Sequence, residues 1–242
     1  MIKEIFKLLL VLFFLGCDSK PKENFKSFDY LPQNTFLVIK VNEIAQIKSS
    51  SLLSNVLSIE KDYKERLNKL QPSYNSEEVL FFFTGIGKSK DAISFISKID
   101  ESDIIELGNK KIIYSGIEIG ISELKDKTKI YTSIIDEFEI VSESKLVIED
   151  CIRNYLNNKK GIINNRFHQL TQIMDSESNV NIFIHPQAKK ILSKFFPYVP
   201  IFPKTGKEWI GLDMDFSSDI FSLNGIVFVN DSLPNFLDLI KD

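Results

Sequence analysis

The sequence predicts an α+β domain in which helices pack on one face of a largely antiparallel sheet. Segments rich in β-branched and aromatic residues outnumber the amphipathic segments that could serve as crossover helices. Several of these strand segments follow one another across short turns, as antiparallel hairpins do. The composition, 43% hydrophobic and 26% charged, is that of a globular chain able to bury a core.

The first elements are a strand and a long helix. Residues 35–44 are dominated by β-branched and aromatic side chains, which predicts a strand. Apolar residues then recur every three or four positions over 52–70, the pattern of an amphipathic helix. Ser51 is placed to cap this helix, and Pro72 to end it.

A run of strands and two helices follows. The strands are expected in pairs, because a glycine turn divides 77–99 and Asp136-Glu137 divides the last pair. The apolar spacing around Cys151 predicts a helix that Ser144 caps and Gly161 closes, with Cys151 packed in the core. The expected strands cover 77–99, 110–120, 129–135 and 138–143, and a weaker helix covers Phe167 to Met174.

The C-terminal part repeats the order of strand, helix and hairpin. This repetition suggests an internal duplication, of about 28–160 and 161–242, within a single domain. The expected elements are a strand at 179–186, a helix at 188–196, a hairpin over 207–217 and 219–231, and a closing helix at 232–242.

The N-terminus has the parts of a bacterial export signal. Lys3 and Lys7 precede a nine-residue apolar stretch, which is too short for a bilayer core that needs about 20 residues. Phe14-Leu15-Gly16-Cys17 resembles a lipobox, in which the cysteine is acylated and becomes the new N-terminus, although Phe14 stands where leucine is usual. An uncleaved buried strand would not explain the two lysines, and a plain secretory signal would more often have a small residue in place of Phe14.

The chain therefore divides into a lipoprotein signal peptide (1–16), a lipidated tether (17–27) and one domain (28–242). Cys17 is the predicted lipid attachment site. One acyl chain holds a protein only marginally, whereas two or more chains of the palmitate kind anchor it stably. We expect a protein of the cell envelope, held on a membrane at the periplasmic or outer-membrane face.

The charge of the chain argues against nucleic acid as a partner. Cleavage removes two lysines and one glutamate from the 30 basic and 33 acidic residues, so the net charge moves from −3 to −4. A basic surface that could neutralise phosphates is not indicated.

Motifs for a nucleotide or a catalytic serine are incomplete. Gly85-Ile86-Gly87-Lys88-Ser89 ends like a phosphate loop, but Phe82 stands where the loop needs its first glycine, so a hairpin turn is favoured. Gly120-Ile121-Ser122 is half of a nucleophile elbow. These patterns predict no catalytic residue and no cofactor.

Motifs for a metal are incomplete as well. His168 and His185 lack partners at ligand spacing, and a hydrogen-bonded structural role is favoured for His185. Asp213, Asp215 and Asp219 lack the glycine and the final glutamate of a calcium loop, so Asp213 and Asp215 are interpreted as the solvent face of a strand. No metal is expected.

One apolar segment stands apart from the predicted core. Residues 195–203 carry aromatic and aliphatic side chains between prolines without any periodicity. Such a loop is either locally buried or a contact with a membrane or partner.

A family resemblance agrees with the envelope location. The lipobox, "FDYLPQNTFLVIKVNEI", "IIDEFEIVSESKLVIEDCIRNY", "EWIGLDMDF" and "LNGIVFVNDSLPNFLDLIKD" together resemble the N-terminal region of a family of uncharacterised flavobacterial lipoproteins. In many of them a β-propeller-like domain follows. The resemblance implies an envelope location and a non-catalytic role.

Three functions are therefore compared. The first is a membrane-anchored module that binds or scaffolds an envelope protein partner. The second is a carrier or sensor that holds an apolar small molecule between the two halves. The third is an enzyme whose site is assembled from scattered carboxylates.

Overall fold

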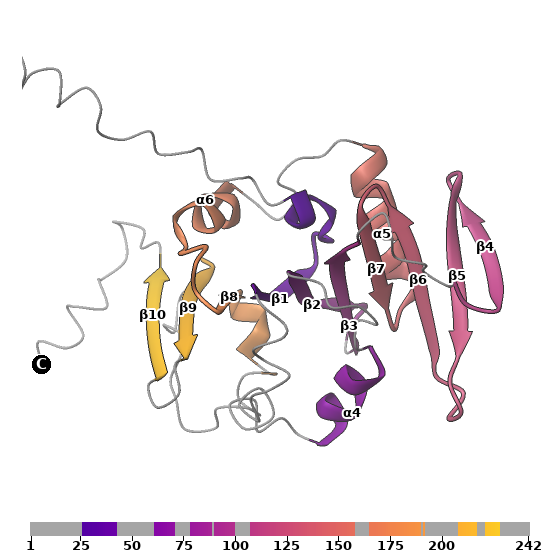
Figure 1. Cartoon of the computed structure of the whole chain (residues 1–242), viewed down its shortest axis with the longest axis horizontal. Coiled ribbons are helices and arrows are strands. Elements are labelled where there is room, and N and C mark those ends of the chain that lie inside the picture. Colours follow the sequence, from indigo (N-terminus) through magenta and orange to yellow (C-terminus); the bar gives the residue numbers. More distant parts are fainter. Residues whose placement is uncertain are drawn as a thin grey trace, which may run out of the picture.

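The computed structural model contains one ten-stranded sheet whose neighbouring strands are all antiparallel (Figure 1). This confirms the predicted antiparallel sheet. The structure describes residues 26–42, 61–70, 78–88, 90–99, 107–157, 165–189, 191, 208–216 and 221–227. The signal peptide, Cys17, Ser51, Pro72, Gly161, Asp219, segment 195–203 and the closing helix lie outside the described residues.

The strands follow the spatial order β10-β9-β8-β1-β2-β3-β7-β6-β5-β4. They are β1 (Thr35–Val41), β2 (Val79–Ile86), β3 (Lys90–Lys98), β4 (Lys110–Tyr114), β5 (Ile117–Glu123), β6 (Lys129–Ile135), β7 (Phe138–Ser142), β8 (Val180–Ile184), β9 (Ile210–Phe216) and β10 (Phe221–Val227). The helices are α4 (Lys61–Lys69), α5 (Lys145–Leu156) and α6 (Asn165–Ile173), and the short 3-10 turns are η1 (Lys26–Tyr30) and η2 (Pro186–Ala188).

The hairpins depend on turn residues that accept positive φ angles. The single strand expected over 110–120 is wrong, because this segment folds into the hairpin of β4 and β5. Ser115 and Gly116, with φ of 50° and 86°, join the two strands, and this pair of positive values matches the twist of a two-residue hairpin. Asp136, with φ of 52°, begins the turn between β6 and β7, and Gly87, with φ of 64°, lies in the turn between β2 and β3. The predicted hairpin turns at Asp136-Glu137 and at the glycines of 85–87 are confirmed.

Helices cover both faces of the sheet, so the prediction of helices on one face is wrong. Every residue of β1 is buried, which means that both faces of the central strands carry apolar side chains and need cover. We call them the α5 face and the α4 face. On the α5 face, η1, α5 and α6 pack over a cluster that contains Val38, Phe82 and Phe183. On the α4 face, residues of α4 and η2 pack over Ile39, Phe83, Phe95 and Val141.

Helix α5 confirms the predicted core position of Cys151, whose side chain is fully buried among the residues of the α5 face. Burial in apolar surroundings raises the pKa of its thiol. Ser144 occupies the N-cap position, but its side chain makes no capping hydrogen bond, contrary to the prediction. Its backbone N–H instead donates to the Ser142 hydroxyl at 3.0 Å.

Two strand triplets meet where β1 pairs with β8. Strand β1 is followed outward by β2 and β3, and β8 by β9 and β10. Ile39 of β1 lies opposite Ile182 of β8, and their outer neighbours are Phe81 and Leu212. The four-stranded meander β4–β7 extends the sheet on the β3 side, and the structure describes no corresponding strands on the β10 side. A duplication of 28–160 and 161–242 stays a prediction.

Candidate functional site

The described chain begins at η1, and η1 is firmly attached to the α5 face. The Tyr155 hydroxyl donates to the Asp136 carboxylate at 2.8 Å, and the Tyr30 hydroxyl donates to the same carboxylate at 3.4 Å. The two tyrosine rings stack with their centroids 6.0 Å apart. Burial, followed by the nearby Asp136 charge, raises the pKa of Tyr30, so its hydroxyl keeps its proton.

Backbone and aromatic contacts add to this attachment. The Asn154 amide of α5 donates to the carbonyl oxygens of Tyr30 and Leu31 at 3.3 and 2.9 Å. The Phe28 ring packs edge-on against Phe167 of α6, at 5.6 Å between centroids, and against Phe183 of β8, at 5.4 Å. These contacts connect η1 to α5, α6 and the sheet. Edge-on aromatic pairs stabilise this attachment beyond the contribution of the apolar area that they bury.

The position of η1 limits where the domain can sit relative to Cys17. The interval from Cys17 to Lys26 is nine residues. A fully extended chain spans at most about 3.6 Å per residue, so this interval reaches no more than about 32 Å. Whatever Cys17 is attached to lies within that distance of η1, which packs on the α5 face.

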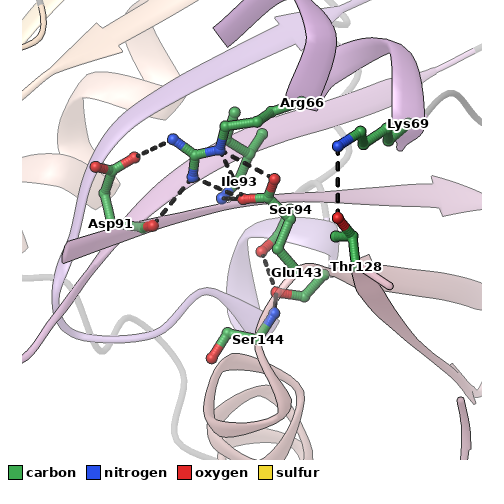
Figure 2. Close-up of polar contacts among 9 residues, drawn as sticks. Arg66, Lys69, Asp91, Ile93, Ser94, Thr128, Glu143 and Ser144 are labelled. Atoms are coloured by element: carbon green, nitrogen blue, oxygen red, sulfur yellow. Dashed lines mark hydrogen bonds and ion pairs between the residues drawn. The ribbon is translucent and has the colours of Figure 1, made fainter. Parts of the chain in front are cut away.

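A second polar cluster fixes α4 to the opposite face, and Figure 2 shows it. Arg66 donates from Nε to Glu143 Oε1 at 3.0 Å and from Nη2 to Oε2 at 2.7 Å. Its Nη1 lies 3.2 Å from Asp91 Oδ2, and its Nη2 also donates to the Asp91 carbonyl at 3.0 Å. Glu143 Oε2 accepts the N–H of Ile93 at 3.1 Å as well.

The Arg66 cluster is partly shielded from water, since Arg66 is 19% and Glu143 13% exposed. Partial burial alone would lower the pKa of Arg66, but the hydrogen bonds and charges of Glu143 and Asp91 outweigh it and raise the pKa. Lys69, one turn further along α4, pairs with Asp126 at 2.5 Å, and this contact lowers the pKa of Asp126. The described apolar contacts of α4 come from Leu67 and from Leu70, which follows the last residue of the helix. Charged contacts therefore make a large part of its attachment.

A third polar group crosses the central strands on the α5 face. Lys40 of β1 is opposite Asn181 of β8, and Asn181 is opposite Asp213 of β9. The Lys40 side chain is 2% exposed and lies 3.4 Å from Glu78 Oε2. Burial lowers the pKa of Lys40, and the Glu78 charge opposes that shift only in part.

Asp213 and Asp215 are structural, and their interpretation as a solvent face is wrong. Asp213 is buried and accepts hydrogen bonds from the Asn181 amide, at 2.7 Å, and from the backbone N–H of Asp175, at 3.1 Å. Asp215 accepts from the Ser178 hydroxyl and from the backbone N–H of Asn179. Through these hydrogen bonds the two carboxylates hold the 175–179 connection between α6 and β8, and they also satisfy the buried carboxylate of Asp213.

The histidines and the glycine motif have local roles. His185 Nδ1 accepts the N–H of Gln187 at 3.3 Å, which confirms its hydrogen-bonded role, and burial lowers the pKa of His185. His168 lies on the exposed side of α6 beside Gln172, at 3.2 Å between their side-chain nitrogens. Gly120-Ile121-Ser122 lies within β5. The described residues contain no group of three or more histidines, cysteines or acids arranged to hold a metal ion.

Sequence reasoning missed the Arg66 and Lys40 clusters. Arg66 and Glu143 are 77 positions apart, and their pairing depends on the sheet placing β7 beside β3. Lys40 did leave a signal, because a single lysine interrupts the apolar run 36–41 of a strand buried on both faces.

Comparisons with known proteins give little that bears on function. The sequence matches no protein-family model and no curated protein. Among solved structures, the chain is similar to TP0453 in its crystal form III, with a TM-score of 0.47 and 13% sequence identity, over 88% of this chain and 83% of TP0453. Within the described part of the chain, no helix is both long and apolar enough to span a bilayer.

Proposed function

We propose that this protein is a lipoprotein of the bacterial cell envelope whose sheet domain is a non-catalytic binding or scaffolding module. The observation that carries the proposal is the placement of Cys17. It ends an apolar stretch that follows two lysines, and it begins a polar tether. The tether leads within nine residues to η1, a segment that the domain holds by hydrogen bonds and aromatic packing.

The attachment of η1 suits a chain that is anchored at its start. A load on the tether passes to α5 through Asn154 and Tyr155, and to α6 and β8 through Phe28. The tether thus leads into a secured part of the domain, and its length keeps η1 within about 32 Å of the group to which Cys17 is attached.

The charged clusters support the non-catalytic part of the proposal. Arg66 with Glu143 holds α4, and Asp213 with Asn181 holds the connection before β8. In each cluster the charged atoms form hydrogen bonds that connect one secondary-structure element to another. A catalytic carboxylate or base would need a polar atom directed at a substrate.

Phase partitioning of the protein from its own membranes tests the anchor. The native chain is expected in the detergent phase and the Cys17→Ala variant in the aqueous phase, because a polar tether has no other affinity for acyl chains. Cys151→Ala is the matched control, since Cys151 is buried in the core, and it is expected to partition like the native chain. Unchanged partitioning of Cys17→Ala would refute lipidation at this residue.

A further inference from the structure

The two edges of the sheet differ in how they are protected. At one edge, β4 carries Lys110 and Lys111, and Lys111 pairs with Glu118 at 2.8 Å. At the other edge, β10 has the sequence FSLNGIV, without a charge or a proline. Charged side chains and prolines are the usual means of keeping an edge strand from pairing with another chain. Edge β10 has neither.

Edge β10 also exposes apolar side chains. Leu223 is 49% and Val227 44% exposed, and both lie on the α4 face, opposite Met214 and Ile210 of β9. Within the described residues, β10 pairs with β9 alone and ends the sheet. Its outward backbone groups, flanked by these side chains, form a surface suited to one more strand.

The strand triplets show what kind of strand fits. In position, β3 is the counterpart of β10, because β3 is the third strand of the triplet β1-β2-β3 and β10 is the third strand of the triplet β8-β9-β10. The outer edge of β3 is occupied by β7, which runs antiparallel to it over Ser94–Lys98. An antiparallel strand placed on the corresponding edge of β10 would repeat the arrangement of β7 beside β3.

We propose that β10 pairs antiparallel with β10 of a second copy of this chain, so that the two sheets join into one in a two-fold symmetric dimer. Two antiparallel neighbours in a sheet are related by a two-fold axis perpendicular to the sheet. Such an axis leaves the α5 faces of both copies on the same side. Because η1 lies on that face, both tethers then leave the same side of the joined sheet.

The position of the two tethers favours antiparallel over parallel pairing of the two copies. Two copies of β10 could also pair in parallel, about a two-fold axis that runs along the strands in the plane of the sheet. The α5 faces of the two copies would then point to opposite sides of the joined sheet, and so would the two tethers. The antiparallel pair suits two chains anchored in one membrane, a point that rests on the proposed function. An interface of one seven-residue strand is small, but confinement to a membrane raises the effective concentration of the second copy.

Cross-linking of the full lipidated chain in its own membranes tests the pairing. Asn224 is the central residue of β10, so in a centred antiparallel pair it faces its own copy, with Cβ atoms about 5 Å apart. A short bismaleimide is expected to give a dimer of Asn224→Cys. The control is Ile113→Cys on β4, whose side chain is 76% exposed but belongs to the protected edge, and it is expected to give no dimer. The buried Cys151 stays unlabelled in a folded chain and reports folding in each variant.

A second variant tests the chemistry of the edge. Adding Leu223→Lys to Asn224→Cys gives β10 the kind of protection that β4 has, and the dimer should be lost while Cys151 stays protected. The proposal is overturned if the introduced thiol at position 224 reacts with a monofunctional maleimide but forms no dimer. It is also overturned if that thiol is shielded by its own chain or cross-links to a different protein. Failure of the anchor would appear instead as aqueous partitioning of the native chain, so the two failures are distinguishable.

Discussion

Replacing Arg66 should destabilise the domain far more than replacing an exposed arginine. Arg66→Met keeps most of the aliphatic stem but removes every hydrogen bond to Glu143 and Asp91. Glu143, 13% exposed, would keep its bond to the Ile93 N–H but lose its cation. A hydrogen bond to a charged group contributes about 1.5–3 kcal/mol, and the bonds of one guanidinium do not add up.

We therefore expect Arg66→Met to lower the free energy of unfolding by about 2–4 kcal/mol, between the values for exposed and fully buried pairs. For a domain of this size each kcal/mol moves Tm by about 2–4 °C, so Tm should fall by about 4–16 °C. Thermal unfolding followed by circular dichroism measures the shift. Arg66→Lys should recover less than half of the loss, because an ammonium cannot bridge both carboxylates as a guanidinium does.

The control is Arg153→Met on α5. Arg153 is 50% exposed, pairs with Asp150 and donates to the Tyr114 hydroxyl at 2.9 Å. An exposed pair of this kind contributes about 0.2–1 kcal/mol. Equal Tm shifts for Arg66→Met and Arg153→Met, or full recovery of Tm by Arg66→Lys, would contradict this reasoning. Either result would mean that the paired hydrogen bonds from Arg66 to the partly buried Glu143 do not hold α4 in place.

Two further predictions concern buried positions. Burial holds the pKa of Lys40 below 10.5, so between the folded and unfolded values the unfolded chain binds more protons and native stability rises with pH. Lys40→Met should be at least as stable as the native chain at pH 7, with a difference that shrinks toward pH 10.5 in urea titrations. A loss above about 2 kcal/mol at pH 7 would show that the contact with Glu78 outweighs burial. Gly211→Ala should cost about 1–3 kcal/mol, since its Cβ would lie 2.4 Å from Met174 Sδ, whereas Gly85→Ala meets nothing closer than 3.9 Å and should cost clearly less.

The hairpin turn at Asp136-Glu137 could be predicted from sequence because its determinants are local: it lies between two apolar runs, and Asp136 accepts a positive φ. Cys151 was placed correctly for the same reason, since helical spacing shows which side of α5 is buried. The turn at Ser115-Gly116 was missed, because 110–120 was expected as one strand.

The arrangement of these elements in space could not be predicted in the same way. Burial of β1 on both faces requires helices on both faces, but the pattern of the strand does not say which helix covers which face. Asp213 alternates with apolar residues like a solvent-facing residue, and only the pairing with Asn181, 32 positions away, shows that it is buried. The Arg66 cluster likewise depends on strands that are distant in sequence.

The central place of β1 imposes an order on the maturation of the chain. Its partner β2 begins 38 positions after Val41, whereas β8 begins at Val180, after the whole meander has been made. During synthesis, a sheet of β1–β7 can form first, and the backbone groups of β1 that later pair with β8 are then still unpaired. Until β8 is complete at residue 184, this side of β1 is an open strand edge that can pair with other chains.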